Sequence, residues 1–436
     1  MALATRRYSD PVHGIITLDR GDPADGLLMA LIDAPEMQRL RRIRQLGLAC
    51  VAFQGAEHSR FAHSLGVMHT MTLALNALRR SGVALAPETC LQARAAALLH
   101  DLGHGPFSHV MEKVLHQRHE DWTARLLGAP ETTVHAILVA YDPELPRRLA
   151  ALMAGEFQPR FVAQLVSSQL DCDRFDYLLR DSLMTGVSYG RYDLPWILNA
   201  LAVDAASGRL IARARGVLAV EEYLFARYHM FRRVYFHHAL RAAENMLVAM
   251  FRRAVTLAAE GALAFRLPES AMDKLLTTRP LTPLEYLSLD DADVLFYIKQ
   301  WQREPDPTLS DLARRFLERR LFKSLEVSDL SPDQIADLRA RISGALVARG
   351  FDPESYLLED SAGDVPYFGP YAPDALDRHI IVEEGRTHPR LREISEVSAA
   401  VAGLRPYRLH RLCFPEAARD VAYEAVRRLA PAELGR

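Results

Sequence analysis

Residues 97–109 read ALLHDLGHGPFSH, an apolar helical run that ends in a cluster of His, Asp and Gly. A helix that only fills a core needs none of these residues at its end. His100 and His104 lie four residues apart, so they share one face of a helix, and Asp101 follows His100 directly. Glycines and a proline at 103–106 end the helix and let backbone approach a ligand closely. Imidazole and carboxylate ligands together suit a cation such as Fe, Mn, Co, Ni or Mg, and the lack of Cys ligands argues against a structural zinc site.

Two other segments support a metal site. The stretch HSRFAHSLG at 58–66 places His63 on a helix together with Arg60. The stretch LDCDRFDYLLRD at 170–181 places four carboxylates on an otherwise apolar helix, namely Asp171, Asp173, Asp176 and Asp181. Burying four carboxylates is costly unless a cation or a basic partner compensates them. A solvated acidic face is the alternative, but apolar residues stand among the acids, so we favour a buried functional face.

The composition is ordinary for a soluble globular protein and leaves the chemistry open. The chain has 436 residues, of which 49% are hydrophobic and 25% are charged. Its 53 Lys and Arg residues nearly balance its 55 Asp and Glu residues, which argues against nucleic acid as a partner. We see no secretory signal and no apolar run of the roughly 18 residues that a membrane span needs. The four Cys residues are scattered, which fits a reducing compartment, so we expect a cytoplasmic protein with no membrane partner.

Hydrophobic spacing predicts a mainly helical chain. Apolar residues recur with helical periodicity over most of 26–265. Within this region, 204–220 predicts a β-hairpin and 220–255 predicts one long helix. The tail from residue 351 mixes strand-like runs with a helix. We therefore expect a mainly α-helical fold with a helical core, a small β-hairpin and a small C-terminal α/β lobe. The predicted units are 1–265, 266–350 and 351–436.

Three motifs identify a family resemblance. HSLG at 63–66, HDLGHGPFSH at 100–109 and D-DR-DYL-RD at 171–181 occur in an order that resembles the HD-domain phosphohydrolases. The likeness is greatest to the deoxynucleoside triphosphate triphosphohydrolases, the branch that includes the sterile-alpha-motif and HD-domain enzymes and their bacterial relatives. It extends from about residue 8 to residue 255 and includes SDPVHGIITLD at 9–19. The resemblance implies an HD-domain catalytic core in 1–265, followed by a helical extension. It also implies a metal-dependent enzyme that cleaves a dNTP to a deoxynucleoside and inorganic triphosphate.

The resemblance implies the roles of the residues around the motifs. The metal ligands would be His63, His100, Asp101 and Asp173. The cation would be Fe, Mn, Co, Ni or Zn, with Mg on the substrate phosphates. The catalytic set would be His104, His109, Glu112 and His119, in which His109 protonates the leaving 5′-oxygen and Glu112 and His119 orient it. Each histidine alone could be an ordinary, partly buried residue, but their joint position after the metal motif favours catalysis.

The same resemblance implies substrate contacts. Arg60, Arg174 and Arg227 would hold the phosphates together with the hydroxyl of Tyr177, because a guanidinium can engage phosphate oxygens bidentately. Gln45 and Asp181 would contact the sugar 3′-hydroxyl, and Tyr235 would lie near the sugar. Any single Arg could instead be a surface residue or belong to an ion pair. Phe231 and Phe236 differ from the family pattern near the base, which leaves base preference open.

A regulatory role is also implied. Asp33, Gln38 and Arg41 match residues that read a guanine activator between subunits in animal members of the family. We therefore expect activation by GTP or dGTP and a homo-oligomer, either a dimer or a tetramer. The alternative for the Arg-rich run at 39–44 is a solvated helix face.

Two other functions stay open at this point. One is an HD phosphohydrolase that acts on a nucleoside monophosphate or a signalling nucleotide. The other is a catalytically inactive, nucleotide-binding regulator.

Overall fold

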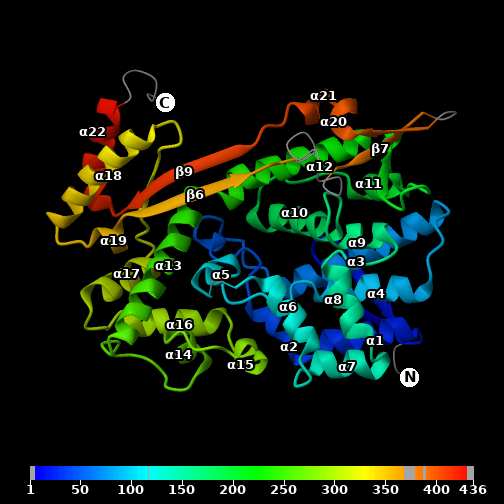
Figure 1. Ribbon diagram of the computed structural model, residues 1–436, viewed down its shortest axis with the longest axis horizontal. Coiled ribbons are helices and arrows are strands. Elements are labelled where there is room, and N and C mark those ends of the chain that lie inside the picture. The colour runs from blue at the N-terminus through cyan, green and yellow to red at the C-terminus, as the bar shows by residue number, and fades with distance from the viewer. Residues whose placement is uncertain (1–4, 116, 368–378, 386–388, 430–436) are drawn as a thin grey trace.

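The computed structural model describes residues 5–115, 117–367, 379–385 and 389–429. It shows an elongated molecule built mainly of helices, which confirms the predicted fold class (Figure 1). The helices of the first half are α1 (Pro23–Asp33), α2 (Pro35–Arg39), α3 (Arg60–Arg80), α4 (Pro87–Leu99), α5 (His109–Leu115), α6 (His119–Gly128), α7 (Thr133–Tyr141), α8 (Leu145–Met153), α9 (Arg160–Val166), α10 (Cys172–Thr185), α11 (Leu194–Ala200) and α12 (Val217–Met230). Those of the second half are α13 (His238–Ala259), α14 (Ala271–Leu276), α15 (Pro283–Leu287), α16 (Asp291–Trp301), α17 (Pro307–Leu317), α18 (Pro332–Val347), α19 (Pro353–Tyr356), α20 (Ile394–Val397), α21 (Ala399–Ala402) and α22 (Arg419–Leu429).

The strands form three small sheets. Their bounds are β1 (Thr5–Asp10), β2 (Gly14–Asp19), β3 (Leu201–Val203), β4 (Leu210–Arg213), β5 (Lys323–Glu326), β6 (Leu358–Asp364), β7 (Ile381–Glu384), β8 (Arg390–Glu393) and β9 (Tyr407–Phe414). Strands β1 and β2 form an antiparallel hairpin, and so do β3 and β4. Only β4 lies within the hairpin predicted at 204–220, because β3 precedes that range and residues 214–220 are helical. The tail contributes to two sheets, because β7 and β8 extend β3–β4 while β6 and β9 pair with β5.

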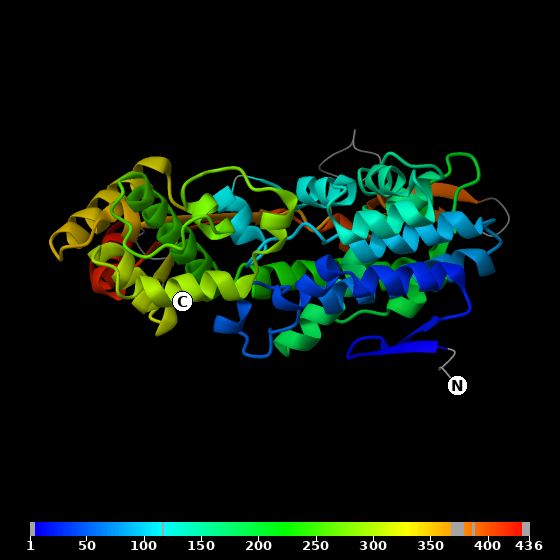
Figure 2. The ribbon, with the colours of Figure 1, turned by 90° about the horizontal axis from the view of Figure 1, so that it is seen from below.

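Two apolar cores hold the molecule together. The first is built from the helices α1–α4 and α6–α12, with β7, α20 and α21 packed against them. The second is built from α13–α19 with β5, β9 and α22. Figure 2 shows the two groups of helices side by side along the long axis, with the hairpin β1–β2 on the outside of the first group. The described residues of 351–436 are thus divided between both cores.

The loop after α4 crosses from one core to the other. Leu102 packs in the first core, and Phe107 packs in the second, together with Val110 of α5. Helix α4 is buried from Leu91 onward except at Arg94, and this part is rich in Ala and Leu, which form helices well and fit between closely packed neighbours. The sequence that ends α4 therefore lies where the two cores meet.

The long helix predicted over 220–255 is wrong, because the chain breaks it. Helix α12 ends at Met230, a π-helical turn follows over Phe231–Tyr235, and α13 starts at His238. His237 has an extended backbone (φ −60°, ψ 129°), and its ring accepts the N–H of Ala239 at 3.3 Å. Such π turns are frequent at functional sites, and this one carries Tyr235. Among the described helices, none combines the length and the apolar character that crossing a membrane requires.

Candidate metal centre

The turn after α4 carries two of the predicted ligands. His100 caps the helix, and Asp101 follows it. Gly103 allows the turn to pack on α6, because a Cβ there would lie 2.2 Å from the carbonyl oxygen of His119. The N–H of Gly103 donates to Oγ1 of Thr123 at 3.0 Å, and that hydroxyl donates to the carbonyl of His100 at 3.1 Å. Helix α6 therefore holds this turn in place.

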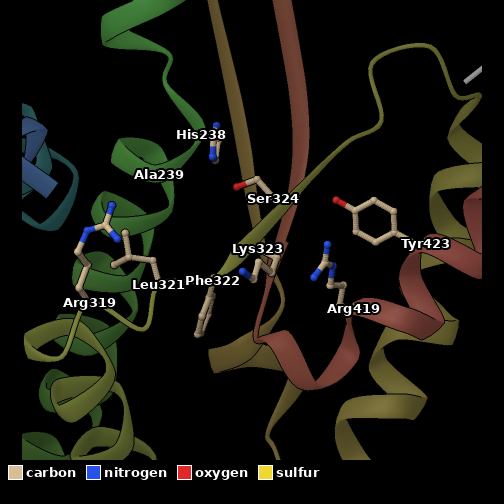
Figure 3. A pocket seen from close by; sticks show the side chains of 9 residues that line it. All are labelled: His238, Ala239, Arg319, Leu321, Phe322, Lys323, Ser324, Arg419 and Tyr423. Atoms are coloured by element: carbon tan, nitrogen blue, oxygen red, sulfur yellow. The ribbon is translucent and has the colours of Figure 1, made fainter. Parts of the chain in front are cut away.

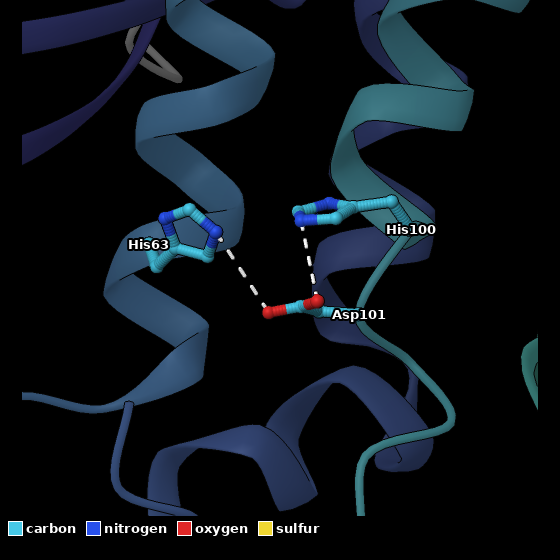
Figure 4. A group of neighbouring side chains, drawn as sticks. All are labelled: His63, His100 and Asp101. Carbon is cyan, nitrogen blue, oxygen red and sulfur yellow. Dashed lines mark ion pairs between the residues drawn. The ribbon is translucent and has the colours of Figure 1, made fainter. Parts of the chain in front are cut away.

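The four predicted ligands meet between three helices. Figure 4 shows His63 of α3 facing His100 and Asp101 across a short gap. Nε2 of His63 lies 3.0 Å from Oδ1 of Asp173 on α10 and 3.8 Å from Oδ2 of Asp101. Nε2 of His100 lies 3.3 Å from Oδ1 of Asp101 and 3.6 Å from Oδ1 of Asp173. Two imidazoles and two carboxylates of the predicted ligand set thus lie around one space.

The donor set fits a divalent cation. Nδ1 of His100 donates to the carbonyl of Ala97 at 2.9 Å, which leaves the lone pair of the neutral ring on Nε2. That Nε2 is buried, and no other group among the described residues hydrogen-bonds to it. Nδ1 of His63 donates to Oδ2 of Asp176 at 2.8 Å, so its Nε2 is also directed into the site. His63, His100 and Asp101 have ligand atoms close enough together to hold a metal ion.

Charged neighbours shift the pKa values of the ligand side chains. Burial alone would lower the pKa of His63, but hydrogen bonds to Asp173 and Asp176 raise it to about 10. Burial would raise the pKa of Asp101, yet the charge of Arg60 and the nearby histidines hold it well below its ordinary value. Against the same effect of burial, hydrogen bonds to His100 and His63 likewise lower the pKa of Asp173. The carboxylates of Asp101 and Asp173 therefore stay ionised at neutral pH, as ligands of a cation must.

Three members of the predicted catalytic set lie next to the metal ligands. Nε2 of His104 lies 3.3 Å from Oδ1 of Asp101, and the His104 ring stacks on that of His119 with centroids 3.7 Å apart. Nδ1 of His119 lies 2.5 Å from Oε1 of Glu112. Burial and the charge of Arg60 hold the pKa of His104 well below its ordinary value. The side chain of His109, the fourth predicted member, lies outside the described part of the chain.

Arg60 is buried inside the site and is already engaged. Its Nη1 donates to Oδ2 of Asp101 at 2.5 Å, and its Nε and Nη2 donate to Oγ of Ser108 at 2.9 and 2.8 Å. Phe107 and Ser108 have φ values of +49° and +52°, which side chains other than glycine rarely adopt. Arg60 therefore links a strained loop to a metal ligand, a role that its phosphate-binding prediction did not include.

The remaining phosphate-binding candidates lie along α10 and α12. Nη1 of Arg174 donates to the carbonyl of Ser168 at 2.5 Å and forms an ion pair with Asp171. Nη1 of Arg227, on α12, donates to Oε1 of Gln169 at 3.1 Å. Burial raises the pKa of Tyr177, and the nearby charges of Arg174 and Arg227 oppose that rise. The structure thus brings Arg174, Arg227 and Tyr177 into one neighbourhood.

The predicted sugar contacts form a second group at the far end of α10. Asp181 accepts hydrogen bonds from Oη of Tyr235 and from Nε2 of His58, both at 2.8 Å. The rings of Tyr235 and Tyr177 meet edge to face with centroids 6.2 Å apart. The backbone N–H of Gln45 donates to the carbonyl of His58 at 2.9 Å, and Oε1 of Gln45 is buried without a hydrogen-bond partner in the described chain.

The predicted activator residues lie close together on the surface. Asp33 forms a bidentate ion pair with Arg6 of β1 at 2.5 and 2.7 Å. Nε of Arg41 donates to Oε1 of Gln38 at 2.8 Å, and its guanidinium lies 3.7 Å from the ring centroid of Phe61. The Arg-rich run is only partly a solvated face, since Arg39 is 2% exposed.

Several residues of the centre escaped sequence reasoning. Asp176 binds His63, and it stood out in the sequence only as one of four acids on an apolar helix. His13 reaches Asp176, and only the resemblance of its motif drew attention to it. Arg39 donates to the carbonyls of Leu289 and His104 at 2.8 and 2.9 Å, and no local signal reveals such a contact.

A separate cavity of about 300 Å³ lies in the second half of the molecule. Figure 3 shows its basic lining, in which His238 stands near Arg319, Lys323 and Arg419. Glu416 pairs with Lys323 at 2.7 Å and with Arg419 at 3.1 Å, which offsets part of the positive charge. None of the predicted site residues lines this cavity.

Comparisons with known proteins agree with this geometry. Residues 60–169 match the HD domain, and residues 197–267 match the HD associated region. The chain is 37% identical to the uncharacterized protein YwfO of Bacillus subtilis, over 94% of this chain and 92% of that protein. It is 26% identical to the deoxynucleoside triphosphate triphosphohydrolase SAMHD1 of Homo sapiens, over 73% of this chain and 54% of that one.

A solved structure shares the whole architecture. The crystal structure of a phosphohydrolase from Bacteroides thetaiotaomicron is 30% identical and superimposes with a TM-score of 0.81. The match covers 94% of this chain and 100% of that one. With the HD motif at the meeting point of three helices, the chain belongs to the HD-domain phosphohydrolases, a family of metal-dependent hydrolases.

Proposed function

We propose that the chain hydrolyses deoxynucleoside triphosphates to a deoxynucleoside and inorganic triphosphate. One observation carries the proposal, namely the order of side chains along α10. The metal ligand Asp173 is followed by Arg174, then by Tyr177, and then by Asp181, which lies about 12 Å further along the helix axis at 1.5 Å per residue. In a dNTP with a cation bound at its phosphates, the phosphate groups and the sugar hydroxyl follow one another in the same order.

The chain's own residues supply binding and proton transfer. His63, His100, Asp101 and Asp173 would hold a divalent cation, which when bound lowers the pKa of water and offsets negative charge on phosphate oxygens. Mg would accompany the substrate phosphates.

The reaction forms a bond from a water oxygen to the α-phosphorus, releases one proton of that water to solvent, and breaks the bond from that phosphorus to the 5′-oxygen. Arg174 and Arg227 hold the phosphates for this displacement. His109 donates a proton to the leaving 5′-oxygen, and Glu112 with His119 orients it.

The experiment that tests the proposal is product analysis. Purified protein is incubated with each dNTP and Mg²⁺ or Mn²⁺, and the products are separated by chromatography. Deoxynucleoside and inorganic triphosphate are expected, because cleavage at the α-phosphorus releases the phosphates as one unit. Release of orthophosphate or pyrophosphate, or turnover of a nucleoside monophosphate instead, would assign the chain to the alternative phosphohydrolase class. Nucleotide binding without turnover would assign it to the regulators.

A matched pair of variants tests the metal requirement. Asp173→Ala removes a ligand and should abolish metal content and turnover together. Asp121→Ala removes an exposed carboxylate on α6 and should change neither. An Asp173→Ala protein that loses its metal but keeps its rate would contradict the proposed mechanism.

We also propose that GTP or dGTP activates the enzyme at Asp33, Gln38 and Arg41, within a homo-oligomer. The support is spatial: Arg41 lies on Phe61, which directly follows Arg60 at the start of the helix that carries His63. A ligand that engages Arg41 would therefore act on the first turn of α3. Rates with single and paired nucleotides test this, and equal rates with and without GTP or dGTP would contradict it. Light scattering measures the mass of the protein in solution and therefore the number of subunits in the oligomer.

A further inference from the structure

We propose that His13 is a positioning residue for the metal ligand His63 and acts through the buried carboxylate of Asp176. The inference rests on the metal site used by the proposed function, but it concerns the N-terminal hairpin, which that function does not use. His13 and Asp176 are 163 residues apart in the sequence, and Nε2 of His13 lies 2.6 Å from Oδ1 of Asp176.

Asp176 is fully buried, and both of its oxygens are saturated. Oδ1 accepts from Nε2 of His13 at 2.6 Å and from Nη2 of Arg180 at 2.9 Å. Oδ2 accepts from Nδ1 of His63 at 2.8 Å and from Nε of Arg180 at 2.7 Å. Four donors thus fix the plane of the carboxylate, and the carboxylate in turn fixes the ring of His63.

The turn between β1 and β2 is built to present His13. Oδ1 of Asp10 accepts the backbone N–H groups of Val12 and His13 at 2.8 and 2.9 Å, which holds the turn in shape. Oδ2 of Asp10 accepts from Nη1 of Arg180 at 2.9 Å. The same turn therefore reaches the Asp176–Arg180 pair twice, once through Asp10 and once through His13.

Loss of His13 would release one side of the carboxylate. Oδ1 of Asp176 would keep only Arg180, so the carboxylate could rotate and the ring of His63 would follow it. Removing a direct partner of a metal-binding histidine typically costs 10–100-fold in metal affinity. His13 acts one residue further away, so we expect a loss at the lower end of that range, about 10-fold.

Three variants of the full chain test the inference through Mn²⁺ affinity, measured by competition with a chromogenic chelator. His13→Ala removes the donor, whereas His13→Gln replaces it with an amide N–H that reaches about as far. His69→Ala is the matched control, because the His69 ring lies 5.3 Å from that of His13 and takes no part in the contacts of Asp176 described above. Thermal unfolding of each apo-protein reports on structure alone.

The expected result is a Mn²⁺ dissociation constant raised about 10-fold in His13→Ala, largely restored in His13→Gln and unchanged in His69→Ala. An unchanged constant in His13→Ala would overturn the inference and leave the proposed function intact. Equal losses in His13→Ala and His69→Ala, in step with lower unfolding temperatures, would also overturn it. A wild-type chain that binds no Mn²⁺ would overturn the metal site and this inference together, whatever the variants do.

Discussion

Oδ1 of Asp291 on α16 accepts the backbone N–H of Phe107 at 2.7 Å, so the second core holds the loop of the metal centre. Oδ2 of the same side chain accepts the N–H of Arg44 at 3.0 Å. Phe107 and Ser108 both have positive φ values, and such strained backbone persists only where its surroundings enforce it. Asp291 is therefore part of what keeps Ser108 on Arg60 and Arg60 on Asp101.

Asp291→Ala should reduce both activity and stability. The buried N–H of Phe107 and the half-buried N–H of Arg44 lose their acceptor, which costs about 1–3 kcal/mol for the buried group, and the loop can relax away from Arg60. We expect kcat to fall at least 10-fold. Asp293→Ala is the control, because its carboxylate caps the N–H of Asp290 in the same helical turn without touching the loop. A normal kcat in Asp291→Ala would contradict the link between α16 and the site. So would a loss of kcat in Asp293→Ala as large as that in Asp291→Ala.

The pH dependence of stability offers a second test of Asp291. Burial raises its pKa to about 6 against an ordinary value of 3.8, although the N–H groups of Phe107 and Arg44 oppose the rise. The folded chain therefore holds this proton more tightly than the unfolded chain, and the contribution of Asp291 to the free energy of unfolding falls as pH rises through about 6. The stability gap between wild type and Asp291→Ala should narrow by about 1 kcal/mol from pH 5 to pH 7.5. Urea unfolding at both pH values measures the difference in the free energy of unfolding between the two proteins. A difference that grows from pH 5 to pH 7.5 would contradict the prediction.

Glu112→Gln should slow the chemistry and leave the metal in place. The carboxylate accepts from Nδ1 of His119 at 2.5 Å, and an uncharged amide would orient and polarise that ring less well. General acid–base catalysis contributes about 10²–10⁴-fold, so we expect kcat to fall by about 10²-fold. Glu120→Gln removes the other carboxylate near the same nitrogen, at 3.4 Å, and should retain activity within about twofold. Metal analysis accompanies the kinetics, and loss of metal in Glu112→Gln would assign the residue a different role.

Asp181 should recognise the sugar 3′-hydroxyl by accepting a hydrogen bond from it. In the structure it is 1% exposed and holds Tyr235 and His58, so a substrate without that hydroxyl would leave a buried acceptor short of one donor. Such a loss costs about 1–3 kcal/mol, or roughly 5- to 150-fold in kcat/KM for a 2′,3′-dideoxy analogue against its dNTP. Asp181→Asn should reduce this preference, whereas Tyr235→Phe, which keeps the carboxylate, should preserve it. If Asp181→Asn discriminates as strongly as the wild type, another group reads the hydroxyl.

Sequence reasoning succeeded where local chemistry is informative and failed where a contact depends on tertiary packing. His100 and Asp101 are adjacent in one turn, and their position at the end of an apolar helix has no explanation from packing, so the centre could be located. The partner of His63 could not be singled out, because Asp176 shares its helix with two other acids, and a third caps that helix. The break at Phe231–Tyr235 was also hidden, since the apolar spacing continues through it. Arg39 looks like a surface residue until Tyr286 of α15, the carbonyl of Leu289 and the site loop surround it.

Gly66→Ala should destabilise the protein although alanine favours helices. Gly66 lies on α3, and a Cβ there would come within 1.9 Å of Oδ1 of Asp176 and 2.3 Å of Nη2 of Arg180. Both atoms are held by the hydrogen bonds that fix His63, so neither can move cheaply, and overpacking of this kind costs about 1–3 kcal/mol. We also expect weaker Mn²⁺ binding, because the displaced carboxylate carries the His63 ring with it. Gly344→Ala on α18 is the control, since open space surrounds that position and the exchange should stabilise the helix by about 0.5–1 kcal/mol. If Gly66→Ala instead raised the unfolding temperature as Gly344→Ala does, the Asp176 carboxylate would not be as rigid as its four hydrogen bonds require.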